Sequence, residues 1–166
     1  MIYYNKKAME ATMKRICTSI LLIVTLLLCL FLTGCTSVST DEAEALITNF
    51  CSALTMADYE TAASYMHTAC NIDADGIKSA TENMEKTLRF DFADGVELGE
   101  RTYWYKSANF NTNGIKGAYT ALSLRHNISI SGQSLVLETT VIGDKTGLSI
   151  SLFKIYAGQS VNNNVA

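Results

Sequence analysis

The sequence predicts an α+β fold in which three N-terminal helices pack on a curved four-stranded antiparallel sheet. Three observations support this prediction. Apolar residues recur at helical spacing between residues 40 and 88. From residue 96 onward they alternate with polar residues or form short β-branched and aromatic runs, which turn sequences separate at 113–114, 131–132 and 143–145. Helices followed by antiparallel strands are typical of a two-layer α+β domain.

The first helix has the clearest start signal. Ser39 and Glu42 form the capping-box pattern, in which each side chain binds the backbone N–H of the other residue. An apolar stripe follows at intervals of three and four residues: Ala43, Leu46, Ile47, Phe50, Cys51 and Leu54. This spacing predicts an amphipathic helix over residues 40–54.

Two shorter stripes predict two more helices. Thr55, with an aspartate three residues later, indicates the start of a helix over residues 56–67. Asp73 and Asp75 are cap candidates for a third helix, whose apolar stripe runs over residues 77–88. Three helices are therefore expected before the first strand.

Four strands in a meander are expected over residues 96–107, 115–130, 133–142 and 148–156. In the longest, alternation places Thr120, Leu122, Leu124, Ile128 and Ile130 on one face, and Tyr119, Ser123, Arg125, Asn127 and Ser129 on the other. The first face is expected to be buried and the second to be wet. The single domain is expected to span residues 41–156, and residues 157–166, which lack an apolar period, to form a disordered tail.

The N-terminal residues indicate an export signal. A short cationic stretch at residues 13–15 precedes an apolar run over residues 16–32, which at about 17 residues is at the lower limit for crossing a ~30 Å hydrocarbon core. The run ends in Leu32-Thr33-Gly34-Cys35, which matches the lipobox of bacterial lipoproteins at every position. Residues 1–34 are therefore predicted to be a signal peptide, with Met13 as an alternative translation start. An uncleaved membrane anchor is the competing interpretation.

Processing at this motif would leave Cys35 as the lipidated first residue, followed by a short tether over residues 35–40. Its acyl chains would hold the protein at a membrane of the cell envelope. Thr36 stands where an aspartate would resemble the inner-membrane retention signal of Gram-negative lipoproteins, so the outer membrane is favoured if the cell has one.

The charge balance argues against a nucleic-acid partner. The leader holds four of the 13 basic and one of the 16 acidic residues, so the remainder keeps nine basic and 15 acidic residues and a net charge of −6. Nucleic-acid binding through a basic face is not expected from such a chain.

Two cysteines remain as thiols after processing. Cys51 and Cys70 are an even remainder in an exported protein, which favours one disulfide, and the alternative is two small buried apolar residues. With only His67 and His126 beside them, they provide no metal-ligand spacing, so neither a metal nor another cofactor is expected.

The helix-then-sheet order resembles the NTF2-like superfamily, also called cystatin-like α+β cones, and within it small bacterial lipoproteins of unassigned function. The resemblance covers about residues 41–156. It rests on the helix pair around Phe50 and Ala57-Asp58-Tyr59, on the third helix, and on the terminal strands over residues 123–156. It implies an apolar pocket between helices and sheet, which some relatives use for isomerase, dehydratase or hydrolase chemistry and others only for binding.

His126 is the one weak catalytic candidate. It lies between Leu124 and Ile128 on the apolar face of its strand, where it could act as a general base with help from Tyr59 or Tyr65. The apolar stripes offer no acid placed to orient the ring. The alternative is a core histidine with satisfied hydrogen bonds.

Aromatic residues give the binding candidates. Tyr103, Trp104 and Tyr105 follow one another on one strand, so alternation sends Trp104 to one face and the tyrosines to the other. Together with Tyr119 they could form a recognition surface, or one face could be core and the other an exposed ladder.

The expected function is that of a membrane-anchored, extracytoplasmic, non-catalytic binding module for a small apolar ligand or an envelope protein. A small hydrolase or isomerase using His126 is the alternative. The wet sheet face carries few lysines and glutamates, so a second copy or an envelope protein is expected to cover it. Arg125 and Glu138 could pair across a two-fold dimer contact there.

Overall fold

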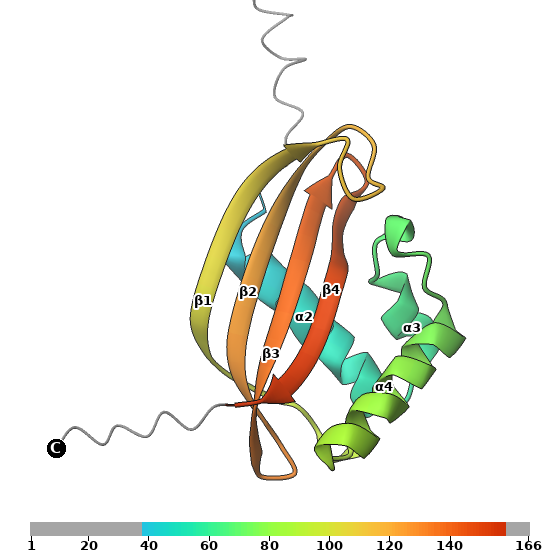
Figure 1. Ribbon diagram of the computed structural model, residues 1–166, viewed down its shortest axis with the longest axis vertical. Helices are drawn as coiled ribbons and strands as arrows, with labels where there is room; N and C mark the ends of the chain where they lie inside the picture. Colours follow the sequence, from blue (N-terminus) through green and yellow to red (C-terminus); the bar gives the residue numbers. More distant parts are fainter. Residues whose placement is uncertain (1–37, 159–166) are drawn as a thin grey trace, which may run out of the picture. The chain divides into compact units, whose positions relative to one another are not determined.

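The computed structural model describes residues 38–158 and confirms the α+β architecture. Its helices are α2 (Thr40–Thr55), α3 (Tyr59–Ser64) and α4 (Ala74–Leu88), with 3-10 turns η1 (Thr68–Cys70) and η2 (Phe92–Asp94) after α3 and α4. The strands β1 (Glu97–Phe110), β2 (Ala118–Ile130), β3 (Gln133–Asp144) and β4 (Gly147–Ala157) form an antiparallel sheet in the order β1-β2-β3-β4 (Figure 1). The predicted signal peptide, Cys35 and residues 159–166 of the predicted tail lie outside the described residues.

The helices begin at the residues best able to cap them. Ser39 and Glu42 form the predicted capping box at α2. The second helix is shorter than predicted, because Thr55 ends α2 and the side chain of Asp58 caps α3 by accepting from the N–H of Thr61. Between the two helices Ala57 has a φ of 53°, which interrupts the helical path.

Turn chemistry sets the strand boundaries. Ser131 and Gly132, with φ values of 53° and 73°, form the two-residue turn between β2 and β3. The last turn lies later than predicted, because Gly143 and Asp144 pair with β4 and belong to β3. β4 extends to Ala157, one residue into the predicted tail.

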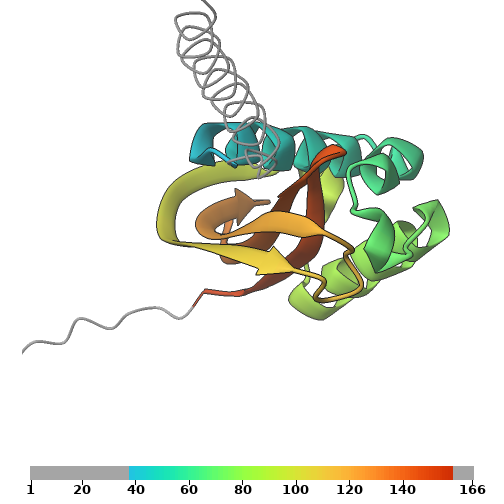
Figure 2. The same cartoon turned by 90° about the horizontal axis from the view of Figure 1, so that it is seen from above.

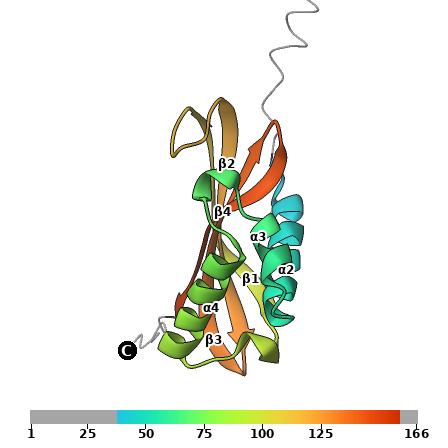
Figure 3. The ribbon, with the colours of Figure 1, turned by 90° about the vertical axis from the view of Figure 1, so that its right-hand side faces the viewer.

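The core lies between α2 and one face of the sheet. Seen from above, α2 lies along one side of the curved sheet (Figure 2), and α3 and α4 lie beside the β4 edge (Figure 3). Phe50 of α2 meets Phe153 of β4 edge to face, with ring centroids 4.7 Å apart. Leu122, Leu124 and Ile128 of β2 are buried on this face, as alternation predicts.

The opposite face, called the open face below, is only partly wet. The prediction that Tyr119 is wet is wrong: its side chain is 1% exposed and packs with Ile115 and Ile142 in a second small cluster. The loop over residues 111–117 places Ile115 in this cluster, and the hydroxyl of Tyr119 lies 2.6 Å from that of Thr112. The chain's own loop therefore covers this end of the open face.

Among residues 38–158, no helix is both long enough and apolar enough to cross a membrane.

Candidate functional site

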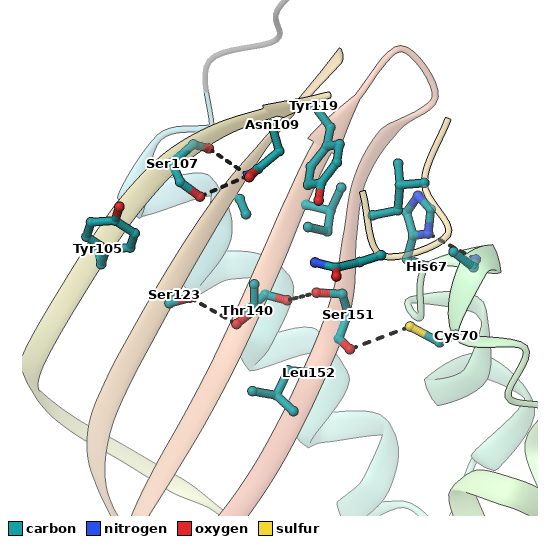
Figure 4. Close-up of a pocket in the computed structure, with 15 residues that line it drawn as sticks. His67, Cys70, Tyr105, Ser107, Asn109, Tyr119, Ser123, Thr140, Ser151 and Leu152 are labelled. Carbon is teal, nitrogen blue, oxygen red and sulfur yellow. Dashed lines mark hydrogen bonds between the residues drawn. The ribbon is translucent and has the colours of Figure 1, made fainter. Parts of the chain in front are cut away.

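A hollow of about 440 Å³ lies on the open face, on the side of the sheet away from α2 (Figure 4). The resemblance implies a pocket between helices and sheet. The hollow found there is smaller, about 250 Å³, and lies between α2 and the start of β1. The open-face hollow is lined by uncharged polar, aromatic and aliphatic side chains and by one histidine: His67, Ala69, Cys70, Tyr105, Ser107, Asn109, Asn113, Ile115, Tyr119, Ala121, Ser123, Thr140, Ile142, Ser151 and Leu152.

Small side chains on neighbouring strands make its floor. The register places Tyr105 beside Ser123 and Ser123 beside Thr140, and in the next row Ser107 beside Ala121. Because side chains alternate along a strand, these residues point away from the leucines that pack toward α2. The small residues in these two rows leave a depression. The Tyr105 ring bounds it on the β1 side, and η1 bounds it on the β4 side.

A bulge in β4 builds that other edge. The register between β3 and β4 shifts so that Ser151 is an extra residue. Ile150 beside it donates its N–H to the carbonyl of Tyr65 and accepts from the N–H of His67, both at 2.8 Å. The thiol of Cys70 points at the carbonyl oxygen of Ser151, 3.5 Å away. These contacts hold η1 against the sheet, where it forms one wall of the hollow.

Hydrogen bonds order several of the lining groups. The hydroxyls of Ser123 and Thr140 are 3.0 Å apart, and the amide nitrogen of Asn109 donates to the hydroxyl of Ser107 at 2.9 Å. Within the described part of the chain, the Tyr105 hydroxyl and the Asn113 side chain have no hydrogen-bond partner. The hollow therefore presents both fixed and unused neutral donors and acceptors.

His67 is held so that neither ring nitrogen faces a substrate as a base. Its Nδ1 accepts from the N–H of Ala69 at 3.0 Å, so the ring hydrogen lies on Nε2, which is 3.5 Å from Oδ2 of Asp144. Burial alone would raise the pKa of Asp144, but hydrogen bonds from the Thr146 hydroxyl and N–H and from His67 lower it below its ordinary value. The His67–Asp144 pair therefore connects η1 to the turn between β3 and β4.

Neither cysteine forms the predicted disulfide, since both are free. Cys51 is buried on α2 beside the hollow near β1, whereas Cys70 lines the open-face hollow. Burial raises the pKa of Cys51 to about 12 and also raises that of Cys70. A thiol with a raised pKa, next to a histidine whose Nδ1 is occupied, lacks the activation that a catalytic cysteine needs.

His126 lies on the core face and is only 1% exposed. Contrary to the expectation that no acid would orient it, Oε1 of Glu44 on α2 lies 3.2 Å from its Nε2 and also accepts from Arg101 at 2.6 Å. The Nδ1 of His126 is buried without a partner among the described residues. This group links α2, β1 and β2 and does not line the open-face hollow, so its geometry is that of a structural histidine.

The aromatic candidates divide between the two faces as predicted. Tyr105 is 58% exposed and lines the hollow, whereas Trp104, 57% exposed, projects from the other side of the same strand. Tyr103 lies in the next row of the open face, with the Arg125 guanidinium 5.5 Å from its ring centroid. Of the predicted binding residues, only Tyr105 and the buried Tyr119 line the hollow.

Arg125 and Glu138 pair within one chain, because β2 and β3 place them side by side with 3.6 Å between their charged atoms. The predicted pairing of these residues across a dimer contact is therefore not needed to satisfy them.

Sequence reasoning missed most of the hollow. Ser107, Asn109, Thr140 and Ser151 carry no motif, and the one available signal was the run of small polar residues on the wet face of β2 and β3. The position of η1 depends on the β4 bulge, which alternation does not reveal.

In the described range, no three His, Cys, Asp or Glu side chains come together in a group that could hold a metal ion. Comparisons with protein-family models, with curated proteins and with solved structures found no match to this chain.

Proposed function

We propose that this chain is a membrane-anchored, extracytoplasmic lipoprotein that acts as a non-catalytic binding module through its open-face hollow. The observation that carries the proposal is the hollow itself. It has the volume of a small-molecule site, a floor of ordered neutral polar groups, and an exposed aromatic ring at its rim. Its polar lining favours a polar ligand over the apolar one that the sequence suggested.

The chemistry of the titratable groups favours binding over catalysis. His126 is enclosed on the opposite face of the sheet, and its Nε2 is taken up by Glu44. In the hollow, both nitrogens of His67 have partners and the pKa of the Cys70 thiol is raised. A general base or nucleophile needs a free, accessible atom within reach of the substrate. The hydrolase or isomerase alternative therefore gains no support from these residues.

Support for the anchor comes from the lipobox and its distance from the domain. The five residue-to-residue steps from Cys35 to Thr40, where α2 begins, span at most about 18 Å when extended. A lipid on Cys35 would then keep the domain close to the membrane surface of the envelope, with the outer membrane favoured in a Gram-negative cell.

Labelling with palmitate tests the anchor. The unaltered chain is expected to take up the label and to sediment with membranes, and Cys35→Ala is expected to lose both properties because only that sulfur can accept the lipid. Label on the Cys35→Ala protein would contradict the lipobox interpretation.

A kinship with NTF2-like cones is part of the proposal. Three helices ahead of a four-stranded antiparallel meander support it. An envelope protein or a second copy remains a proposed partner for the part of the open face beside the hollow, where Tyr103 is half exposed.

Photo-crosslinking in living cells tests the binding role. Replacing Tyr105 with p-benzoylphenylalanine places a reactive ring at the rim of the hollow. The same replacement of Trp104 places it on the opposite face of the same strand with nearly equal exposure, 58% against 57%. Mass spectrometry then identifies any adduct.

An adduct at position 105 that is absent at position 104 is expected, because only residue 105 faces the proposed site. Adducts at neither position, or only at position 104, would overturn the hollow as the binding site.

A further inference from the structure

We propose that the ligand of the open-face hollow is a neutral sugar. This inference rests on the proposed binding function and names the chemical class that the hollow would take. The groups that carry it are the uncharged floor, the hydroxyl pair on β2 and β3, and the ring of Tyr105.

Charge is the first criterion. Of the described residues that line the hollow, none is Asp, Glu, Lys or Arg. The next row of the open face carries Arg125, Glu138 and Lys154. Arg125 pairs with Glu138 at 3.6 Å, and Lys154 lies over the Tyr156 ring, outside the lining of the hollow. An ionic ligand would lose hydration in the hollow without gaining a counter-charge, which costs free energy. The site therefore favours a ligand without net charge.

Hydrogen bonding is the second criterion. Ser123 and Thr140 share one hydrogen bond 3.0 Å long, so one hydroxyl of the pair keeps its hydrogen for another acceptor. The Tyr105 hydroxyl and the Asn113 amide, free of partners among the described residues, add further donors and acceptors. A purely apolar ligand would bury these groups unsatisfied, whereas sugar hydroxyls both donate and accept as serine hydroxyls do.

The aromatic rim is the third criterion. Tyr105 is paired with Ser123 in the strand register, and its side chain is 58% exposed. The face of an aromatic ring carries partial negative charge and attracts the weakly positive C–H groups on one face of a sugar ring. A flat ring next to a row of hydroxyls thus matches both the apolar face and the polar edge of a pyranose.

A peptide fits less well. Extended peptides bind mainly by adding a strand to a free sheet edge. The hollow instead spans the face of all four strands, and at the β4 edge beside it the segment from Tyr65 to His67 already makes two hydrogen bonds to Ile150. The loop over residues 111–117 bounds another side through Asn113 and Ile115. This enclosure suits a compact ligand.

Saturation-transfer NMR on the full chain tests the inference. The protein is held in a polyoxyethylene detergent, because the head groups of glucoside and maltoside detergents are themselves sugars. The probes are maltose and N,N′-diacetylchitobiose as neutral sugars, glucuronate as an anionic sugar, and hexanol as an apolar molecule. Three variants are compared with the unaltered chain: Tyr105→Ala, Ser107→Leu, which fills the floor, and Trp104→Ala, which alters the opposite face.

Saturation transfer to at least one neutral disaccharide is expected for the unaltered chain and for Trp104→Ala. The affinity is expected to fall about tenfold or more in Tyr105→Ala and Ser107→Leu. No transfer to either disaccharide at millimolar concentration, equal affinity in all variants, or preference for hexanol or glucuronate would overturn the sugar class.

The two proposals fail in different ways. If the position-105 crosslink forms but neither sugar binds, only the ligand class is wrong. If the crosslink is absent as well, the binding role of the hollow is wrong.

Discussion

At the scale of single residues, the group around Glu44 shows how one carboxylate can serve two partners. Its Oε1 accepts from the buried Nε2 of His126 and from the guanidinium of Arg101. The Nδ1 of that ring already lacks a partner among the described residues, so Glu44 supplies the one hydrogen bond that the His126 side chain makes there. Its contribution to stability should therefore exceed that of an ordinary surface carboxylate.

Glu44→Ala is expected to lower the free energy of unfolding by about 1–3 kcal/mol, because it leaves a buried N–H without an acceptor. Glu44→Gln keeps an acceptor oxygen and should cost less. Glu100→Ala, at an exposed carboxylate, is the control and should change stability by less than about 0.5 kcal/mol. Equal losses in Glu44→Ala and Glu100→Ala, measured by urea denaturation, would contradict the structural role of Glu44.

Asp144 should make stability depend on pH in the acid range. Its pKa is lowered in the fold from 3.8, since the hydrogen bonds of its carboxylate outweigh burial. A depressed folded pKa gives stability that is present above the unfolded value and is lost as pH falls through the folded value. Asp144→Asn is thus expected to be less stable than the unaltered chain by about 1.5 kcal/mol at pH 7.

That difference should shrink as the pH falls below 3.8, because Asp144 takes up a proton in the unfolded chain before it does so in the folded one. Chemical denaturation at pH 7 and at pH 3 measures it. A difference of the same size at both values would show that the charge of Asp144 is not the stabilising feature.

At the scale of elements, the β2–β3 turn illustrates which features local sequence can predict. Both central residues have positive φ, a conformation that glycine adopts freely and serine does not. The pair Ser131-Gly132 was recognisable as a turn because its short, flexible residues separate two β-rich runs. The two positions of this turn should therefore differ in how much a substitution costs.

Gly132→Ala is expected to destabilise the fold by about 1 kcal/mol because it places a Cβ at a φ of 73°. Ser131→Gly relieves a residue at a φ of 53° but also loses the hydrogen bond from the Ser131 hydroxyl to Asp94, so it is expected to destabilise the fold less than Gly132→Ala does. Thermal denaturation of both variants measures the contrast. Destabilisation by Ser131→Gly as large as that by Gly132→Ala would contradict the turn geometry.

Other elements depended on contacts that no local pattern reveals. Thr55 and Asp58 are both residue types that commonly cap the start of a helix. Asp58 caps the second helix, which starts at Tyr59, whereas Thr55 is the last residue of α2. Cys51 and Cys70 are an even number of thiols, as one disulfide requires, but α2 and η1 place them in different hollows. In each case the tertiary position decided between two locally acceptable outcomes.

At the scale of the whole molecule, the spacing of apolar residues predicts the architecture but does not predict the open-face hollow. Three helices and a four-strand meander follow from where the apolar spacing changes, and Leu122 and Leu124 lie on the buried face as alternation required. The hollow required three further features: a bulge at Ser151, the seating of η1 against it, and the loop that buries Tyr119. The contact between η1 and β4 joins residues 81 positions apart in the sequence, Cys70 and Ser151, whereas the bulge and the loop lie between neighbouring strands.

The same limit applied to the candidate residues. His126 is the one titratable ring on the apolar face of its strand, and the acid that orients it comes from a helix about 80 residues earlier in the chain. Tyr105 could be named from its aromatic neighbours, yet only the strand register shows that it borders Ser123 and the hollow, whereas Trp104 does not.

The central claim is that this chain works through the open-face hollow and that the His126 side of the sheet is structural. Hydrogen–deuterium exchange on the full chain, in native envelope membranes and after purification in detergent, tests it most directly. Peptides from β1 and β2 that contain Tyr105 and Ser123 should exchange more slowly in membranes, where the ligand is present, while α2 peptides around Glu44 should exchange equally in both. Equal exchange throughout, or protection confined to α2, would contradict the account.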